Sequence, residues 1–341
     1  MKSTVEHNRM VWDQNKRGHY EVWYCTFNHR ASRTGYWIRY TLESPLEKVG
    51  PAYCQLWFGF FDANNPRRNF AINKRMPIDQ LRSDNAPFAI QMGDARLEHG
   101  KLSGALGNEQ HNVSWDLEFD PATFTHFHLP DIVYRKNFAD TKVLSPNLMV
   151  NYRGKIEVDG ETYTFEGDPG CQTHLWGRKH AHAWAWGHCN AFREDPTAAL
   201  EILSVKLKRG PIVTPTMTLF SLYLGSDVYN FRDFYVLPLT RGNWETGLYS
   251  FGARGKSVKI EGEFRCRPED LVRTPYEDPD GEPSFCHNTE VADMTVTVWN
   301  RRSALVGFRQ HARLTARGTG HFEYASRSPD GRVEAQHQTI D

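Results

Sequence analysis

The chain has 341 residues, enough for one large or two medium domains, and its formal net charge is zero. This balance gives no reason to expect binding to nucleic acid or attraction to an anionic membrane surface. No apolar run approaches the roughly 18 residues of a membrane span, and residues 1–21 lack the apolar segment of a secretion signal. We therefore expect a cytoplasmic protein.

The six cysteines occur singly, without a Cys-x-x-Cys pair, which argues against a zinc ribbon or a redox dithiol and favours reduced, partly buried thiols. Aromatic residues make up 13% of the chain, and the 10 tryptophans are not accompanied by long leucine and alanine stretches. Because aromatic and β-branched side chains fit pleated surfaces, the composition favours strands over helices.

Short segments of alternating polarity, bounded by turn residues, recur along the whole chain and predict strands. In chain order they cover residues 19–28, 35–44, 52–62, 88–98, 112–120, 153–167, 198–210, 257–266, 293–301 and 318–327. Asp159-Gly160 divides the sixth segment and predicts a tight hairpin turn. Helical periodicity is weak, and only Pro77 to Leu81 is expected to hold a turn or two of helix.

Many short antiparallel strands over this length indicate an all-β protein made of two barrels or two sandwiches. The best break lies at residues 192–199, FREDPTAA, where charged residues and Pro196 interrupt two strand-like runs. We therefore expect one unit over residues 1–195 and a second over residues 196–341.

Residues 180–192, HAHAWAWGHCNAF, sort large aromatic and ionisable side chains onto one face of a strand and small ones onto the other. The same parity continues upstream, so the segment predicts one strand, or one strand with a bulge at Gly177. The large side chains of this row are His174, Trp176, Arg178, His180, His182, Trp184, Trp186, His188 and Asn190.

Three interpretations of the row compete. It could be a tightly packed barrel interior with hydrogen-bonded imidazoles, or a metal site built on His180 and His182 with His188 as a further ligand. The third is a ligand cavity with aromatic walls and a few orienting polar groups. We favour the cavity because Trp176, Trp184 and Trp186 are bulkier than barrel filling requires.

The segment PGCQTHLWGRKHAHAWAWGHCNAF resembles the WG…W.W…N.F pattern of the tocopherol cyclase and carotenoid 1,2-hydratase (hydroxyneurosporene synthase) group. GYWIRYTLESP, CQLWFGFFD, HNVSWDLEF, FCHNTEVADMTV and GTGHFEYASR extend the resemblance over nearly the whole chain. The resemblance implies two consecutive lipocalin-like antiparallel β-barrels. It also implies a hydrophobic substrate, because members include hydratases and cyclases of isoprenoids.

Hydration or cyclisation of an isoprenoid begins with protonation of an alkene, and indole faces can shelter the resulting carbocation. Burial among aromatic rings raises the pKa of a carboxyl group, so Asp or Glu is the natural acid. The resemblance implies a His-x-Trp pair, here His174 and Trp176, with Glu201 on the following strand as the acid. Glu201 also stands out because its neighbours, Leu200 and Ile202 among them, are apolar.

The hypothesis is thus an acid-initiated hydratase or cyclase that needs no redox cofactor and no metal. Glu201, His174 or His182 would donate the proton, the tryptophans would shelter the cation, and Asn190 and Arg178 would orient the substrate. His180, His188 and Trp23 would line the cavity, inside a barrel or at the junction of the two.

Other polar clusters are expected to be mostly structural. They are Glu21 with Trp23, His321 with Glu323, and His287 with Glu290 and Asp293.

Two other classes of protein remain open: a lipid or pigment carrier without turnover, and a metal enzyme using His180, His182 and His188. The expected partner is a hydrophobic small molecule, with transient membrane contact as its possible source. Motifs of serine hydrolases, nucleotide-binding proteins and zinc peptidases are absent from the sequence.

Overall fold

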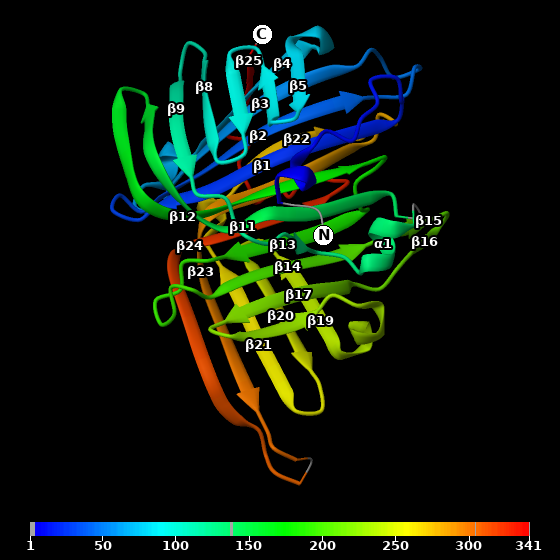
Figure 1. Cartoon of the computed structure of the whole chain (residues 1–341), viewed down its shortest axis with the longest axis vertical. Coiled ribbons are helices and arrows are strands. Elements are labelled where there is room, and N and C mark those ends of the chain that lie inside the picture. Colours follow the sequence, from blue (N-terminus) through cyan, green and yellow to red (C-terminus); the bar gives the residue numbers. More distant parts are fainter. Residues whose placement is uncertain (1–3, 137–138, 304, 341) are drawn as a thin grey trace.

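A computed structural model describes residues 4–136, 139–303 and 305–340, and in this part the chain is almost entirely β-structure. Two large antiparallel sheets curl into two barrels that lie one above the other in Figure 1. The expected all-β fold of two lipocalin-like barrels is confirmed.

The first sheet has 13 strands in the order β25-β4-β3-β2-β1-β12-β11-β9-β8-β7-β6-β5, with β10 paired to β11. Only β25, from the end of the chain, runs parallel to its neighbour, β4. The strands are β1 (His19–His29), β2 (Thr34–Ser44), β3 (Tyr53–Asp62), β4 (Phe70–Pro77), β5 (Leu81–Asn85), β6 (Phe88–Met92), β7 (Ala95–Glu98), β8 (Lys101–Gly107), β9 (Asn112–Phe119), β10 (His126–Phe127), β11 (Thr141–Val158), β12 (Glu161–Gly177) and β25 (His337–Ile340).

The second sheet has 10 strands in the order β18-β17-β14-β13-β24-β23-β21-β20-β19, with β22 paired to β23. Its strands are β13 (Ala183–Cys189), β14 (Ala199–Lys206), β17 (Met217–Leu224), β18 (Asp227–Phe231), β19 (Thr240–Glu245), β20 (Leu248–Arg254), β21 (Val258–Arg265), β22 (Val272–Glu277), β23 (Pro283–Asn300) and β24 (Arg309–Ser326).

The remaining elements are short. They are the hairpin of β15 (Lys208–Arg209) and β16 (Ile212–Val213), the helix α1 (Asp131–Arg135), and the 3-10 turns η1 (Thr4–Asn8), η2 (Pro66–Arg68), η3 (Ile78–Gln80), η4 (Phe234–Leu239) and η5 (Pro268–Asp270). No helix of the described residues is long and apolar enough to cross a membrane.

The central strands of the first sheet are covered on both faces. Every residue of β2 is buried, because one face of the strand meets the core of its own barrel and the other meets the second sheet. In β1, Trp23 and Phe27 point into the barrel core, whereas Tyr20 and Tyr24 point toward the second sheet. The two sheets therefore pack face to face through β1, β2 and β12.

Local turn chemistry agrees with the sequence. Asp159 and Gly160 both have positive φ, at 51° and 86°, and join β11 to β12 in the predicted hairpin. The helix expected at Pro77 to Leu81 is a single 3-10 turn, η3.

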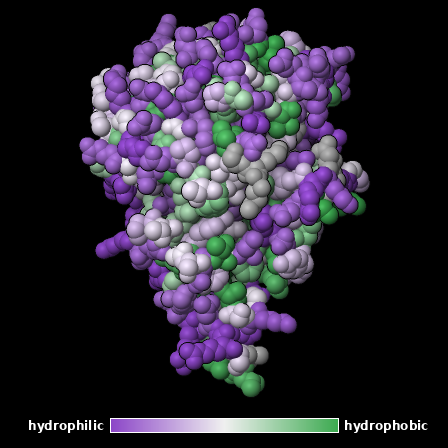
Figure 2. All heavy atoms as spheres, in the orientation of Figure 1, coloured by the Kyte–Doolittle hydropathy of each residue, from purple (hydrophilic) through white to green (hydrophobic). Residues whose placement is uncertain are grey.

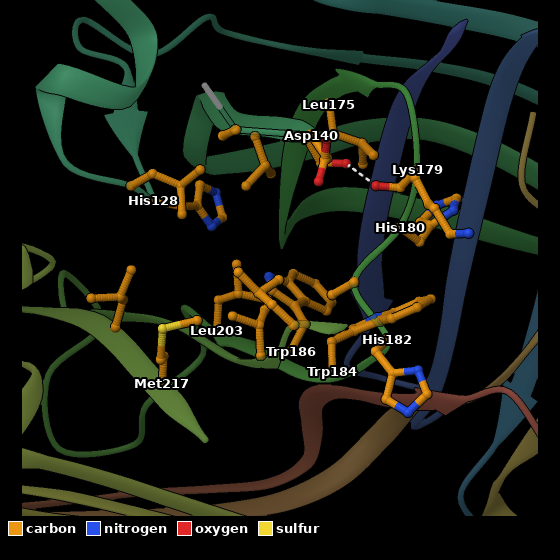
Figure 3. A pocket seen from close by; sticks show the side chains of 18 of the residues that line it. His128, Asp140, Leu175, Lys179, His180, His182, Trp184, Trp186, Leu203 and Met217 are labelled. Atoms are coloured by element: carbon orange, nitrogen blue, oxygen red, sulfur yellow. Dashed lines mark hydrogen bonds between the residues drawn. The ribbon is translucent and has the colours of Figure 1, made fainter. Parts of the chain in front are cut away.

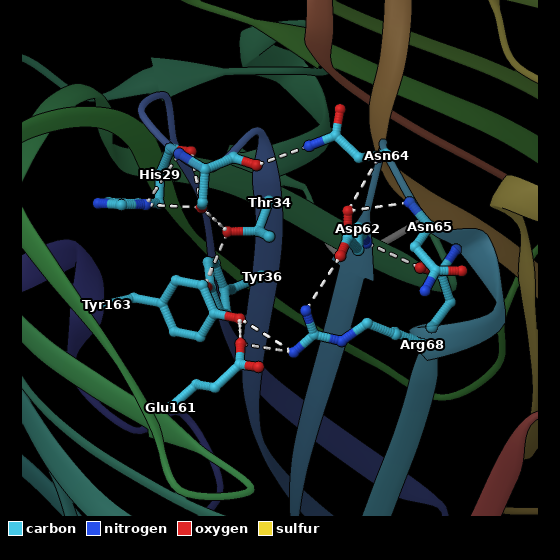
Figure 4. A network of polar contacts seen from close by, with 11 residues as sticks. His29, Thr34, Tyr36, Asp62, Asn64, Asn65, Arg68, Glu161 and Tyr163 are labelled. Carbon is cyan, nitrogen blue, oxygen red and sulfur yellow. Dashed lines mark hydrogen bonds and ion pairs between the residues drawn. The ribbon is translucent and has the colours of Figure 1, made fainter.

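The rim of the first barrel is tied together by a polar network around Arg68, on the turn after β3 (Figure 4). The Arg68 guanidinium lies 2.7 Å from a carboxylate oxygen of Glu161 and 3.3 Å from one of Asp62. It also donates to the Tyr163 hydroxyl, which in turn donates to Glu161. The network links the β3–β4 turn to the start of β12.

The expectation of one continuous strand through the His and Trp row is wrong. β12 ends at Gly177 and β13 begins at Ala183 in the other sheet. A Cβ at Gly177 would lie 2.3 Å from the backbone oxygen of Asp140, so this close approach requires glycine. The chain thus changes sheets within residues 178–182, while a division into domains at residues 195 and 196 stays a prediction.

Candidate active site

A cavity of about 570 Å³ lies between the two sheets. Its walls come mainly from β1 and β12 on one side and from β13 and β14 on the other, with α1 and η4 at one edge. Figure 3 shows Trp184, Trp186 and Leu203 facing His128 and Leu175 across it. Most of the wall is apolar, so the space suits a hydrophobic ligand.

Two tryptophans of β13 form the aromatic wall and are fixed by their indole N–H groups. Trp184 donates to Glu323 Oε1 at 2.8 Å, and Trp186 donates to Glu201 Oε1. Tyr24 of β1 meets the Trp186 ring edge-on, with ring centroids 5.9 Å apart. Because the indole nitrogen of each tryptophan has a hydrogen-bond partner, both rings are held in place.

Glu201 lies directly behind this wall and is 1% exposed. On β14 it stands opposite His188 of β13, whose Nδ1 lies 2.8 Å from Glu201 Oε2. His128 Nδ1 approaches the other carboxylate oxygen, at 3.3 Å. One buried carboxyl group therefore meets two imidazoles and an indole N–H, away from solvent.

His128 connects this carboxyl group to the cavity. It lines the cavity, whereas Glu201 and His188 do not. Burial lowers the pKa of His128, while the charge of Glu201 acts to raise it. His128 Nε2 lies 3.0 Å from Ser145 Oγ, which fixes the ring. The pair thus brings a buried carboxyl group into contact with an imidazole at the cavity wall.

Of the residues expected at the site, His174, Trp176 and Trp23 lie on the other side of the first sheet. His174 stacks on Trp23 with centroids 5.0 Å apart, and its Nε2 lies 2.8 Å from Glu21 Oε1. Although burial acts to raise the pKa of Glu21, hydrogen bonds from His174 and His19 lower it. His174 is buried and Trp176 is partly exposed beside it, and neither lines the cavity.

Two histidines of the segment that connects the two sheets, residues 178–182, line the cavity in different surroundings. His180 lines the cavity between the rings of Tyr20 and Trp184, and its Nδ1 lies 2.7 Å from Asp278 Oδ1. His182 also lines the cavity, and burial lowers its pKa.

Two further residues of the row lie off the cavity. Arg178 is exposed and pairs with Asp140, whereas Asn190 is buried and donates to the backbone oxygen of Gly170. Neither Arg178 nor Asn190 lines the cavity, so its polar groups come from elsewhere.

The three histidines weighed as metal ligands do not come together. Among the described residues, no three His, Cys, Asp or Glu side chains are arranged to hold a metal ion. His180 faces Asp278 and His188 faces Glu201, which are separate carboxylates.

Two of the carboxyl groups expected to be structural differ in their position: one links the two sheets and the other lines the cavity. Glu290 accepts from the Tyr24 hydroxyl at 3.1 Å and from Thr26, and thereby links the sheets. Burial raises the pKa of the Glu290 carboxyl well above its ordinary value. Glu323, in contrast, lines the cavity.

His287 and Asp293, from the same clusters, lie elsewhere. His287 stacks on Tyr324, with ring centroids 4.7 Å apart, and Asp293 pairs with Arg317. Neither of them lines the cavity.

Sequence reasoning missed His128, Tyr24 and Arg39, which all line the cavity. His128 belongs to the segment THFHLPD, where a second His-x-His pattern precedes a proline. Arg39 is the cation at the centre of GYWIRYTLES, with aromatic and apolar residues on either side of it and Glu43 four positions later. Both features can be seen in the sequence, but neither indicates a role until the packing of the two sheets is known.

Comparison with known proteins agrees with this architecture. Over 308 residues, 89% of this chain and 88% of the relative, the chain is 22% identical to "Uncharacterized protein Rv0493c" of Mycobacterium tuberculosis strain H37Rv. The same figures hold for "Uncharacterized protein MT0513" of strain CDC 1551. The crystal structure of a putative AttH from Nitrosomonas europaea superposes with a TM-score of 0.54 at 12% identity. That superposition covers 96% of this chain and all of that one, and it shows the shared fold.

The family model described as tocopherol cyclase-like matches residues 93–319. This match spans strands β7 to β12 of the first sheet, the crossing between the sheets and nearly all of the second sheet. The chain belongs to the tocopherol cyclase-like family.

Proposed function

We propose that this protein catalyses the acid-initiated hydration or cyclisation of a hydrophobic, isoprenoid-like molecule in the cavity between its sheets. One observation carries the proposal: a buried carboxyl group, Glu201, is held against His128 at the wall of an otherwise apolar, aromatic cavity. Family membership supports the same class of chemistry.

In this mechanism the proton starts on the Glu201–His128 pair and leaves from His128, the member of the pair that lines the cavity. Because Nδ1 faces Glu201, the proton leaves from Nε2, which exchanges its contact with Ser145 Oγ for the substrate. The π electrons of the substrate alkene form the new C–H bond and leave a tertiary carbocation, which the faces of Trp184 and Trp186 shelter from stray water. In a hydration, water adds to the cation and releases a proton. In a cyclisation, a hydroxyl group of the substrate adds and releases its proton, so neither reaction consumes a proton overall.

The test compares two buried carboxyl groups that each lie 2.8 Å from a histidine nitrogen, Glu201 behind the cavity wall and Glu21 inside the first barrel. We expect Glu201→Gln to lower turnover of an acyclic or aromatic-headed isoprenoid by at least about 100-fold, the scale of general acid catalysis, while its Kd changes little. Glu21→Gln should keep turnover. Full turnover by Glu201→Gln would refute the proposal, and binding without turnover by the wild type would identify a carrier.

We further propose that the substrate reaches the cavity from a membrane surface. The elements at the edge of the cavity, α1, β15–β16 and η4, expose a collar of apolar side chains, and Lys208 and Arg209 lie beside it. The collar consists of Ile132, Ile212, Val213, Phe234, Tyr235 and Leu239, of which Tyr235 is 79% exposed. Figure 2 shows hydrophobic atoms at the right edge of this face, at the height of β15 and β16 in Figure 1.

Such a basic and apolar collar suits a bilayer that contains anionic lipids. We expect the protein to sediment with phosphatidylcholine vesicles that contain phosphatidylserine, and Tyr235→Asp with Ile212→Asp to weaken this binding. Leu305→Asp is the matched control, since Leu305 is 98% exposed at the far tip of the β23–β24 hairpin. Equal loss of binding in both variants, or no binding by the wild type, would contradict this route of entry.

A further inference from the structure

Arg39 brings a buried cation to the cavity. It lies on β2, is 6% exposed and lines the cavity. Its Nε donates to Thr41 Oγ1 at 3.1 Å, and its guanidinium carbon lies 4.0 Å from the centre of the Tyr276 ring. Among the described residues Arg39 makes no ion pair within 4 Å, although a buried guanidinium is costly unless an anion or water meets it.

Among the described residues, the carboxyl groups near Arg39, those of Glu323 and Glu43, make no ion pair with it within 4 Å. Glu323 accepts from Trp184 Nε1 at 2.8 Å and from Cys286 Sγ at 3.4 Å. Burial raises the pKa of the Glu43 carboxyl well above its ordinary value, even beside Arg39. The Arg39 charge is therefore left without a partner of its own.

Other cations at the cavity differ from Arg39 because they have partners. Arg327 lies 2.6 Å from Asp278, Lys179 lies 2.6 Å from Asp280, and Arg209 lies 2.8 Å from Asp140. Lys208 makes no ion pair among the described residues, but it is exposed to water. Arg39 is thus the buried cation at the cavity for which a bound anion would supply the missing ion-pair partner.

We propose that Arg39 binds the carboxylate of an isoprenoid acid, so that the substrate of this cavity is an anionic amphiphile. This inference rests on the proposed function and names its substrate class. A guanidinium presents two parallel N–H donors that match a carboxylate. A single positive charge balances a monocarboxylate, whereas a phosphate or diphosphate carries more negative charge than one guanidinium neutralises.

The first sheet also relates Arg39 to the proton donor. Arg39 stands opposite Tyr24 of β1, and Tyr24 stands opposite Thr173 of β12. Thr173 Oγ1 lies 3.0 Å from Ser145 Oγ on β11, and Ser145 Oγ lies 3.0 Å from His128 Nε2. Since neighbouring strands lie about 4.8 Å apart, the three strand-to-strand steps from β2 to β11 cover at most roughly 14 Å along the curled sheet. A ligand anchored at Arg39 would therefore present a double bond remote from its carboxylate to His128.

The experiment measures the affinity of farnesoic acid, farnesol and methyl farnesoate for the full-length protein by quenching of tryptophan fluorescence. We expect the wild type to prefer the acid at least about tenfold over the alcohol and the ester. Arg39→Gln should remove this preference while farnesol binds as before, and Arg39→Lys should keep part of it. Arg75→Gln is the matched control, because Arg75 stacks on Tyr53 in the same way outside the cavity.

The outcomes separate this inference from the proposed function. Equal binding of acid and alcohol by the wild type would refute the role of Arg39 and leave a neutral isoprenoid as the substrate. A preference that survives in Arg39→Gln would refute it as well. If none of the three compounds binds, both the anionic substrate and the proposed hydrophobic ligand class are wrong.

Discussion

Replacing Glu201 by alanine should destabilise the protein strongly, because the carboxyl group accepts two buried hydrogen bonds and lies 3.3 Å from the nitrogen of a third buried side chain. His188 Nδ1, Trp186 Nε1 and His128 Nδ1 all approach it. Each donor left without an acceptor costs about 1–3 kcal/mol, and breaking a buried charged pair costs about 3–5 kcal/mol in total. Because the three contacts share one carboxyl group, we expect a loss of about 3–5 kcal/mol and not three separate penalties.

The assay is equilibrium unfolding in urea. Glu201→Gln keeps an amide oxygen as acceptor, so we expect it to lose only about 1–2 kcal/mol. Glu282→Ala should change the free energy of unfolding by less than about 0.5 kcal/mol, since the Glu282 side chain is 59% exposed in its pair with Lys179. If Glu201→Ala unfolds at the same urea concentration as the wild type, the carboxyl group is not the centre of a buried cluster and the reasoning fails.

Three other perturbations test the same packing. Trp186→Phe keeps a ring in the wall but removes the N–H donor to Glu201, so it should cost about 1 kcal/mol in urea unfolding; a stabilised variant would contradict the hydrogen bond. Burial lowers the pKa of His287 and His337 from 6.5 to about 4. Protonation of these imidazoles therefore favours the unfolded chain, so the free energy of unfolding should fall as the pH drops from about 6.5 to about 4. The double variant His287→Gln with His337→Gln should flatten that dependence. Burial raises the pKa of Cys25, Cys54 and Cys189 to about 12, so mass spectrometry after brief treatment with iodoacetamide should find these thiols labelled only once the protein unfolds.

The strands and the strongest turn could be predicted because their causes are local. Alternation along β1 and β2 and the Asp159-Gly160 turn are properties of a few consecutive residues. The same parity argument failed at Gly177, where the chain leaves one sheet for the other. Parity fixes the faces of one strand, but it cannot show that His174 and Trp184 belong to different sheets.

The site required contacts between residues that are distant in the sequence. Glu201 stood out in the sequence as a carboxyl group in an apolar strand, and the structure buries it and pairs it with His188 across adjacent strands, while its catalytic role stays a prediction. His128 reaches the same carboxyl group from the segment between β10 and α1, through packing of the two sheets. No pattern in the sequence fixes that packing, so the connection from Glu201 to the cavity could not be predicted.

The most direct test of the proposed chemistry is the fate of the solvent proton. Purified protein is incubated in deuterium oxide with farnesoic acid and with a panel of acyclic and aromatic-headed isoprenoids, and the masses of the products are read. We predict a hydrated or cyclised product with deuterium bound to carbon, formed by the wild type and not by Glu201→Gln. Compounds that bind and are recovered unchanged, or a product without carbon-bound deuterium, would contradict acid-initiated catalysis in this cavity.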